Sequence, residues 1–228
     1  RVRPDALLMD VTSLKGAPLA AMLEATAASG ASVVGTHPLY GPGVHGFTGQ
    51  RAVVVKGRGD AGYAWVKAAF AARGLVVVEA SAEEHDRVMA AVQVLNHFQT
   101  QVMGLALARL GLPLERTLDF TSPAYLLETY VVGRHFAQSP SLYGPIEMDN
   151  PMRDEATRVF RDAAEELAEV LASGEQTRLD AVFAEVRGYP GEAFTAEAPD
   201  PSRLLGHRLI QPTAGRAPED ARQPARTR

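Results

Sequence analysis

Cysteine is absent from this chain of 228 residues, which excludes disulfide bonds, thiolate catalysis and cysteine-ligated zinc. No histidine spacing typical of a metal site occurs either, so we expect no metal. No apolar run approaches the roughly 18 residues of a membrane span, and no signal-peptide pattern is present, so we expect a cytoplasmic protein. The net charge of -4 argues against binding to nucleic acid. A small-molecule ligand fits this composition better.

A glycine-rich dinucleotide-binding turn is also missing. Such a turn follows a strand and opens a helix, whose N-terminus then holds the pyrophosphate. The stretch "GPGVHG" at 41–46 contains three glycines but lacks this context, because no helical pattern follows it. The first residue is arginine rather than methionine.

The first third of the chain alternates short β-branched runs with alanine-rich helical patterns. This alternation predicts an α/β fold with an incomplete Rossmann-like sheet. Only a loop, with no helical pattern, separates the third run from the second. The third strand can therefore be antiparallel to the second. The predicted strands are 6–11, 31–35, 51–55 and 75–80, and the predicted helices between them are 17–28 and 61–73.

From residue 82 onward the strand patterns stop, and an all-α helical region is predicted. Ser81 is a typical N-cap, with Glu84 three positions later, and one long helix is expected to run from there to Gly111. The predicted domains are a Rossmann-like part at 1–81, an all-α dimerisation domain at 82–194, and a Pro/Arg-rich tail at 195–228. Further helices are predicted at 122–137, 151–173 and 175–187.

Polar residues follow the first two predicted strands. Ser13 and Lys15 lie in "DVTSLKG", and His37 lies in "GTHPLYGPG". If these strands are parallel neighbours, the side chains emerge at one sheet edge, where ligands bind. Ser13 could then orient His37, and His37 could act as a general base. The alternatives are that Ser13 only caps a helix, that Lys15 is solvated, and that His37 is a structural loop histidine.

A polar stripe is predicted on the long helix. Asp86, Gln93 and His97 are spaced by seven and four residues, so they share one face of a helix. Such a stripe either lines a wet cavity or forms a hydrogen-bonded structural seam. His85 lies off the stripe, at the start of the helix.

Arg134 lies in "YVVGRHFAQ", the least polar part of its predicted helix. An arginine in such a place needs an anion. The anion is either a ligand or an internal carboxylate, such as Glu128 or Glu147.

Four motifs together resemble the prephenate dehydrogenase family: "DVTSLKG", "GTHPLYGP", "EHDRVMAAVQVLNHF" and "FTSPAYLLETYVVGRHFAQSPSLYGPIEM". The likeness is greatest to the dehydrogenase part of the bifunctional chorismate mutase–prephenate dehydrogenases. It implies that His37 is the catalytic histidine and that Arg134 holds a substrate carboxylate. It also implies that Ser13 and Lys15 line the nicotinamide and substrate side, with Ser13 contributing to both catalysis and cofactor binding. His85, Gln93 and His97 match the substrate-binding wall of the cleft.

The resemblance implies NAD-dependent oxidative decarboxylation of prephenate, or of arogenate, within tyrosine biosynthesis, by a homodimer. Members of the family carry a glycine-rich βα unit upstream of the first motif, roughly 60 to 90 residues at about 30 residues per βαβ step. Two classes of function therefore remain open. The first is a dehydrogenase, and the second is a non-catalytic ligand-binding or dimerisation module that lacks the cofactor site.

Overall fold

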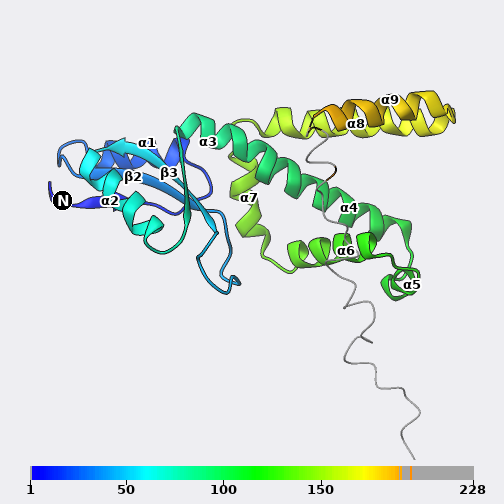
Figure 1. Cartoon of the computed structure of the whole chain (residues 1–228), viewed down its shortest axis with the longest axis horizontal. Coiled ribbons are helices and arrows are strands. Elements are labelled where there is room, and N and C mark those ends of the chain that lie inside the picture. The colour runs from blue at the N-terminus through cyan, green and yellow to red at the C-terminus, as the bar shows by residue number, and fades with distance from the viewer. Residues whose placement is uncertain (1, 190, 192–195, 197–228) are drawn as a thin grey trace, which may run out of the picture. The chain divides into compact units, whose positions relative to one another are not determined.

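The computed structural model describes residues 2–189, 191 and 196, and the tail predicted at 195–228 lies outside them except for Ala196. The α/β sheet followed by a helical region is confirmed (Figure 1). The strands are β1 (Leu7–Met9), β2 (Ser32–Pro38), β3 (Arg51–Arg58) and β4 (Val76–Ala80), with α1 (Gly16–Ala25) after β1 and α2 (Asp60–Ala71) between β3 and β4.

The four strands form one mixed sheet in the order β1-β2-β3-β4. β1 pairs with β2 in parallel, β2 pairs with β3 antiparallel, and β3 pairs with β4 in parallel. The loop 39–50 contains no helix, whereas a parallel connection usually needs one, so the antiparallel pairing of β2 and β3 fits this loop. The stretch 41–46 therefore joins two strands and opens no helix.

A helix covers each face of the sheet through β-branched side chains. Leu19 of α1 packs against Val33, Val53 and Val55 on one face. Val66 of α2 packs against Val34 and Val54 on the other. Because neighbouring residues of a strand point to opposite faces, one valine-rich strand fills both cores. The packing of the two helices on opposite faces fixes the position of β2, the strand that carries His37.

The helical region begins where predicted, and Ser81 is confirmed as an N-cap, since its hydroxyl accepts a hydrogen bond from Glu84 N. The predicted single long helix is wrong in one respect, because a π-helical turn interrupts it. Two short helices, α5 and α7, also stand where the sequence predicted none. The helices are α3 (Ala82–Met89), the π turn η1 (Ala90–Leu95), α4 (Asn96–Leu110), α5 (Leu114–Asp119), α6 (Pro123–Phe136), α7 (Pro140–Met148), α8 (Arg153–Ser173) and α9 (Gln176–Gly188).

The chain forms two compact units, and each is discontinuous in sequence. The first comprises Arg1–Gln99 and Ser139–Asp162, so it joins the sheet with α3 and α7. The second comprises Thr100–Gln138 and the described residues from Ala163 onward. Within the described residues, none of the helices has the length and apolar character needed to cross a bilayer.

Candidate active site

The site is organised around the buried carboxylate of Asp86, which lies on α3 and is 5% exposed. Asp86 Oδ1 accepts a hydrogen bond from Lys15 N at 2.8 Å, and Oδ2 accepts one from Gly16 N at 2.9 Å. These are the first amides of α1, which no carbonyl within that helix can satisfy. The carboxylate also lies at the positive end of the helix dipole. Asp86 therefore caps α1 from another element, and Ser13 does not.

A line of hydrogen bonds connects Asp86 to His37. His85 Nδ1 lies 2.7 Å from Asp86 Oδ1, and His85 Nε2 lies 2.9 Å from His37 Nδ1. The carboxylate only accepts, so the proton of neutral His85 is on Nδ1, and its Nε2 is an acceptor. His37 Nδ1 must then donate, which leaves the lone pair of neutral His37 on Nε2. No hydrogen bond from the described residues reaches this nitrogen, so it can accept a proton.

The surroundings keep both histidines neutral. Burial lowers the pKa of His37 from 6.5 to about 4, and electrostatic interactions with His85 and with the Lys15 ammonium group add to this effect. Burial also lowers the pKa of His85, although Asp86 acts in the opposite direction. Near neutral pH, His37 is therefore unprotonated, which is the form that a general base requires.

Lys15 is the N-cap residue of α1, and its side chain is fully buried. Its ammonium group pairs with the Asp10 carboxylate and donates to Thr36 O at 2.7 Å. The Lys15 side chain is thus used within the protein and is not exposed to a ligand in this structure, and its predicted contact with substrate stays a prediction.

His85 and Ser13 also differ from their predicted roles. His85 was predicted to bind substrate, but both of its ring nitrogens are used internally and the residue is 2% exposed. Ser13 was expected to orient His37, but it forms no hydrogen bond with it, and His85 performs this task instead. Ser13 does line a pocket of about 640 Å³ at the carboxyl end of β1, so its predicted contact with a cofactor or substrate remains a proposal. This pocket is lined by Val11, Thr12, Ser13, Leu14, Gly16, Ala17, Pro18, Asp86, Leu142, Pro145, Ile146, Asp149 and Pro151.

Gln93 and His97 lie beyond Asp86 along the same helical segment, and both are half-buried. His97 Nδ1 is 3.4 Å from Glu147 Oε1 of α7, and its ring meets Tyr143 edge-on at 4.8 Å between centroids. The side-chain oxygen of Gln93 is buried and has no hydrogen-bond partner among the described residues. The structure thus gives His97 a protein partner, whereas the buried Gln93 oxygen has none among the described residues.

Sequence reasoning missed Asn150, which is 2% exposed. Its Nδ2 donates to Asp86 O at 3.0 Å, and its Oδ1 accepts from Met152 N at 2.8 Å. Asn150 thereby fixes the main chain of the residue that organises the site. The signal was present in the sequence "DNP", because asparagine before proline is typical of a turn.

Arg134 lies in the second unit, on the last turn of α6, and it is exposed. The ion pairs of the described residues include none between Arg134 and Glu128 of the same unit, and Glu147, the other predicted partner, belongs to the first unit and lies beside His97. Its guanidinium group is therefore open to an external anion.

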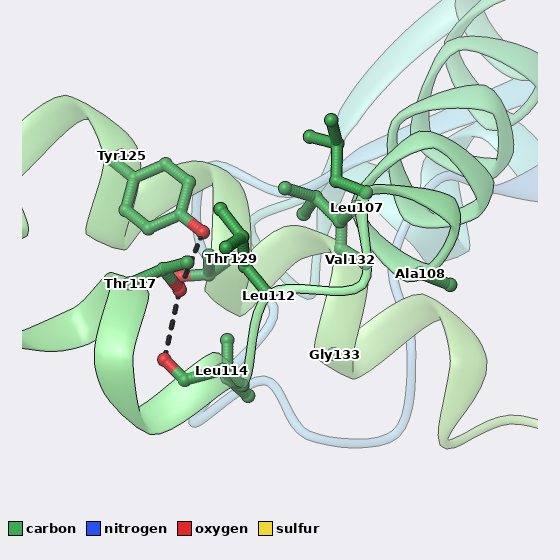
Figure 2. Close-up of a pocket in the computed structure, with 10 residues that line it drawn as sticks. Leu107, Ala108, Leu112, Leu114, Thr117, Tyr125, Thr129, Val132 and Gly133 are labelled. Carbon is green, nitrogen blue, oxygen red and sulfur yellow. Dashed lines mark hydrogen bonds between the residues drawn. The ribbon is translucent and has the colours of Figure 1, made fainter.

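The second unit also holds an apolar pocket of about 290 Å³ between the end of α4, α5 and α6 (Figure 2). At its polar side, Tyr125 OH donates to Thr117 Oγ1 at 2.9 Å, and Thr117 Oγ1 donates to Leu114 O at 2.9 Å. Three leucines that line it, Leu110, Leu112 and Leu114, are 69%, 62% and 55% exposed. Large apolar side chains exposed together mark a surface that binds another molecule.

Comparison with known proteins identifies the family. Residues 81–185 match the family described as "Prephenate dehydrogenase, dimerization domain". The chain belongs to the prephenate/arogenate dehydrogenase family. It is 35% identical over 188 residues to the T-protein of Enterobacter agglomerans, covering 82% of this chain and 50% of that protein. It is 32% identical over 173 residues to a probable arogenate/prephenate dehydrogenase of Methanocaldococcus jannaschii, covering 75% and 39%.

The fold of the family is also found among solved structures. The prephenate dehydrogenase from Aquifex aeolicus, solved in complex with hydroxyphenyl propionate and NAD+, has a TM-score of 0.60 and 20% identity. The match covers 83% of this chain and 68% of that one. The present chain spans half or less of the length of the two relatives named above.

The pKa of His37 predicts a pH-dependent stability. Below pH 6.5 the unfolded chain takes up a proton on this histidine, whereas the folded chain does so only near pH 4. The free energy of unfolding should therefore fall as the pH drops from 6.5 to 4, by roughly 3 kcal/mol from His37. We expect His37→Asn to remove this part of the decrease in urea unfolding curves measured across that range. His45→Asn, at an exposed loop histidine, should follow the wild type. An unaltered pH dependence in His37→Asn would contradict the assignment.

Proposed function

We propose that this chain carries the proton-accepting centre of a dehydrogenase that oxidatively decarboxylates prephenate, or the related arogenate. The observation that supports this most directly is the line from Asp86 through His85 to His37, which leaves the Nε2 lone pair of a neutral histidine unused. A general base must be unprotonated and held in one tautomer, and this line provides both conditions. A histidine that is only structural has no need of a free ring nitrogen.

The chemistry follows from the substrate. Prephenate carries a hydroxyl group on the ring carbon that is oxidised, and His37 Nε2 accepts the proton of this hydroxyl. The oxygen would become a carbonyl oxygen as the hydride on the same carbon leaves, and a bound nicotinamide cofactor would supply the acceptor for that hydride. Loss of carbon dioxide from the ring then makes the product aromatic. The imidazolium that forms at His37 donates from Nδ1 to His85 Nε2, and the Asp86 carboxylate beyond His85 stabilises the positive charge.

The cofactor we propose is NAD, as in the Aquifex aeolicus protein. The described residues do not fit its pyrophosphate: the helix after β1 would be the natural cradle, but Asp86 already occupies its first amides. The glycines at 41–46 stand between two strands and open no helix. Pyrophosphate binding therefore lies outside the described residues, and this chain supplies the acid–base and substrate side. A non-catalytic module is the alternative, and the turnover measurement below decides between them.

We propose that Arg134 binds the substrate carboxylate. The guanidinium group is a planar fork that can bind a carboxylate with two parallel hydrogen bonds. Its exposure and the absence of an ion pair within the described residues are consistent with this role. Ser13 and Gln93 are the further ligand contacts that we propose, because one lines the large pocket and the other has an unpaired oxygen.

The test of the proposed function is turnover by His37→Asn. We expect kcat to fall by about 10²-fold or more, since acid–base catalysis supplies about that share, while KM changes little. The measurement is NADH formation from prephenate, in the longest form of the protein that contains this chain, with His45→Asn as the control. Full activity in His37→Asn would overturn the assignment. A wild type that binds the substrate but never turns it over would favour the non-catalytic module.

Arg134 can be tested without turnover. Each charge-assisted hydrogen bond contributes about 1.5 to 3 kcal/mol, so Arg134→Gln should weaken binding of 4-hydroxyphenylpyruvate roughly 10- to 100-fold. Because Arg134 is exposed, the melting temperature should remain near that of the wild type. Calorimetric titration and a thermal melt measure the two effects. Arg109→Gln, at another exposed helical arginine, is the matched control, and equal affinities in both variants would exclude the anchor role.

We further propose that the chain forms a homodimer through the helical region. The matched residues 81–185 include all those that line the apolar pocket of Figure 2. Exposed leucines are costly in water, and a symmetric second copy would bury them.

The proposed dimer predicts that a charge introduced at this pocket weakens dimerisation. Leu112→Lys places a charge where the second copy would pack, so we expect mainly monomer at micromolar concentration by light scattering. Folding should be little affected, because the side chain is 62% exposed. Trp65→Lys is the matched control, since Trp65 is equally exposed at 62% but lies on α2, outside the matched residues. A Leu112→Lys protein that stays dimeric would show that this pocket is not at the interface.

A further inference from the structure

The end of β2 is held in an unusual way next to His37. The parallel ladder between β1 and β2 ends at Met9 and Val34. On β2, Ser32 and Val34 face β1, and the next residue with this orientation is Thr36, since strand residues alternate. On its other side Thr36 lies opposite Val54 of β3, but β1 has ended at Met9, so no residue of β1 is left to pair with Thr36.

Two side chains take the place of the missing strand. Asp10 Oδ1 accepts from Thr36 N at 3.1 Å, and Lys15 Nζ donates to Thr36 O at 2.7 Å. The Thr36 hydroxyl donates in turn to Asp10 O. Both backbone groups of Thr36 are thus satisfied by an oppositely charged pair, whose members also bind each other.

The surrounding residues make room for this pair and hold it. A Cβ atom at Gly35 would lie 3.2 Å from Lys15 Cδ, so the glycine lets the lysine side chain pass beside β2. The main chain of Lys15 is fixed by Asp86, the same carboxylate that orients His85. Burial acts to raise the pKa of Asp10, but hydrogen bonds from Lys15 and Thr12 outweigh it and lower the pKa. Burial lowers the pKa of Lys15, and its hydrogen bond with Asp10 acts in the opposite direction.

We propose that Lys15 and Asp10 are positioning residues for His37: by replacing β1 at Thr36, they fix the main chain of the residue before His37, while His85 fixes the ring. The inference rests on the proposed role of His37 as the base. Direct contact of Lys15 with the substrate is the competing role, and the zero exposure of Lys15 argues against it.

The first test observes His37 itself. The chain has six histidines, so labelling histidine with nitrogen-15 gives six resolvable rings. In the wild type, His37 should show a single tautomer with the proton on Nδ1. In Lys15→Met and in Asp10→Asn, we expect this signal to broaden or to shift toward a mixture of tautomers. Amide exchange at Thr36 and His37 should also become about 10-fold faster or more.

Two controls separate positioning from general destabilisation. Val66→Ala removes core packing on α2, and it should lower the melting temperature without changing the His37 signals. The double variant Asp10→Leu/Lys15→Met leaves no buried unpaired charge, so it should melt higher than Lys15→Met. It should nevertheless keep the altered His37 signals, because Thr36 still lacks partners. Wild-type His37 signals in both Lys15→Met and the double variant would overturn the proposal.

Kinetics distinguish positioning from substrate contact. In the longest form of the protein, Lys15→Met should lower kcat about 10-fold or more with KM changed less than about twofold, because only the base is displaced. A raised KM at unchanged kcat would instead indicate substrate contact and overturn the positioning role. If the His37 signals change as expected but His37→Asn keeps full turnover, the proposed function fails while the positioning of His37 stands.

Discussion

The candidate site depends on one buried carboxylate. Asp86 satisfies the first two amides of α1 and the Nδ1 proton of His85, and the side chain of Asn150 holds its carbonyl oxygen. A carboxylate buried in this way is stable only if it is fully hydrogen-bonded. Placing Asp86 therefore requires α1, α3 and the turn before α8 to be in position together. The tautomer of His37 follows from that arrangement.

Much of the fold could be predicted from the sequence because its signals are local. Alternating β-branched runs located every strand, and Ser81 marked the start of α3. The π turn could not be predicted, since 90–95 reads as an ordinary apolar helix. α7 was not predicted, and it contains Pro145, a residue type that is unfavourable inside a helix. Strand β2 extends through Pro38, beyond the predicted range 31–35, because β3 pairs with it there.

The site was predictable in its residues but less so in their roles. His37 followed from the sheet-edge rule and from the family resemblance. The contacts that hold His37 did not, because only tertiary packing brings His85 to its ring and Asp10 to the neighbouring Thr36. Lys15 and His85 carry polar groups that suggested ligand contact. Both side chains are buried, however, and their polar groups bind other residues of the protein. Exposure, which a sequence does not show, decided each of these cases.

The fully buried Lys15 has a practical consequence. The chain contains only three lysines, and the other two, Lys56 and Lys67, form ion pairs with Asp60 and Glu79 at the surface. An amine-reactive reagent can therefore modify Lys15 only when the segment around it opens transiently. The acylation rate of this one lysine thus reports how often the end of β2 comes apart, and the two surface lysines calibrate the reagent within the same molecule.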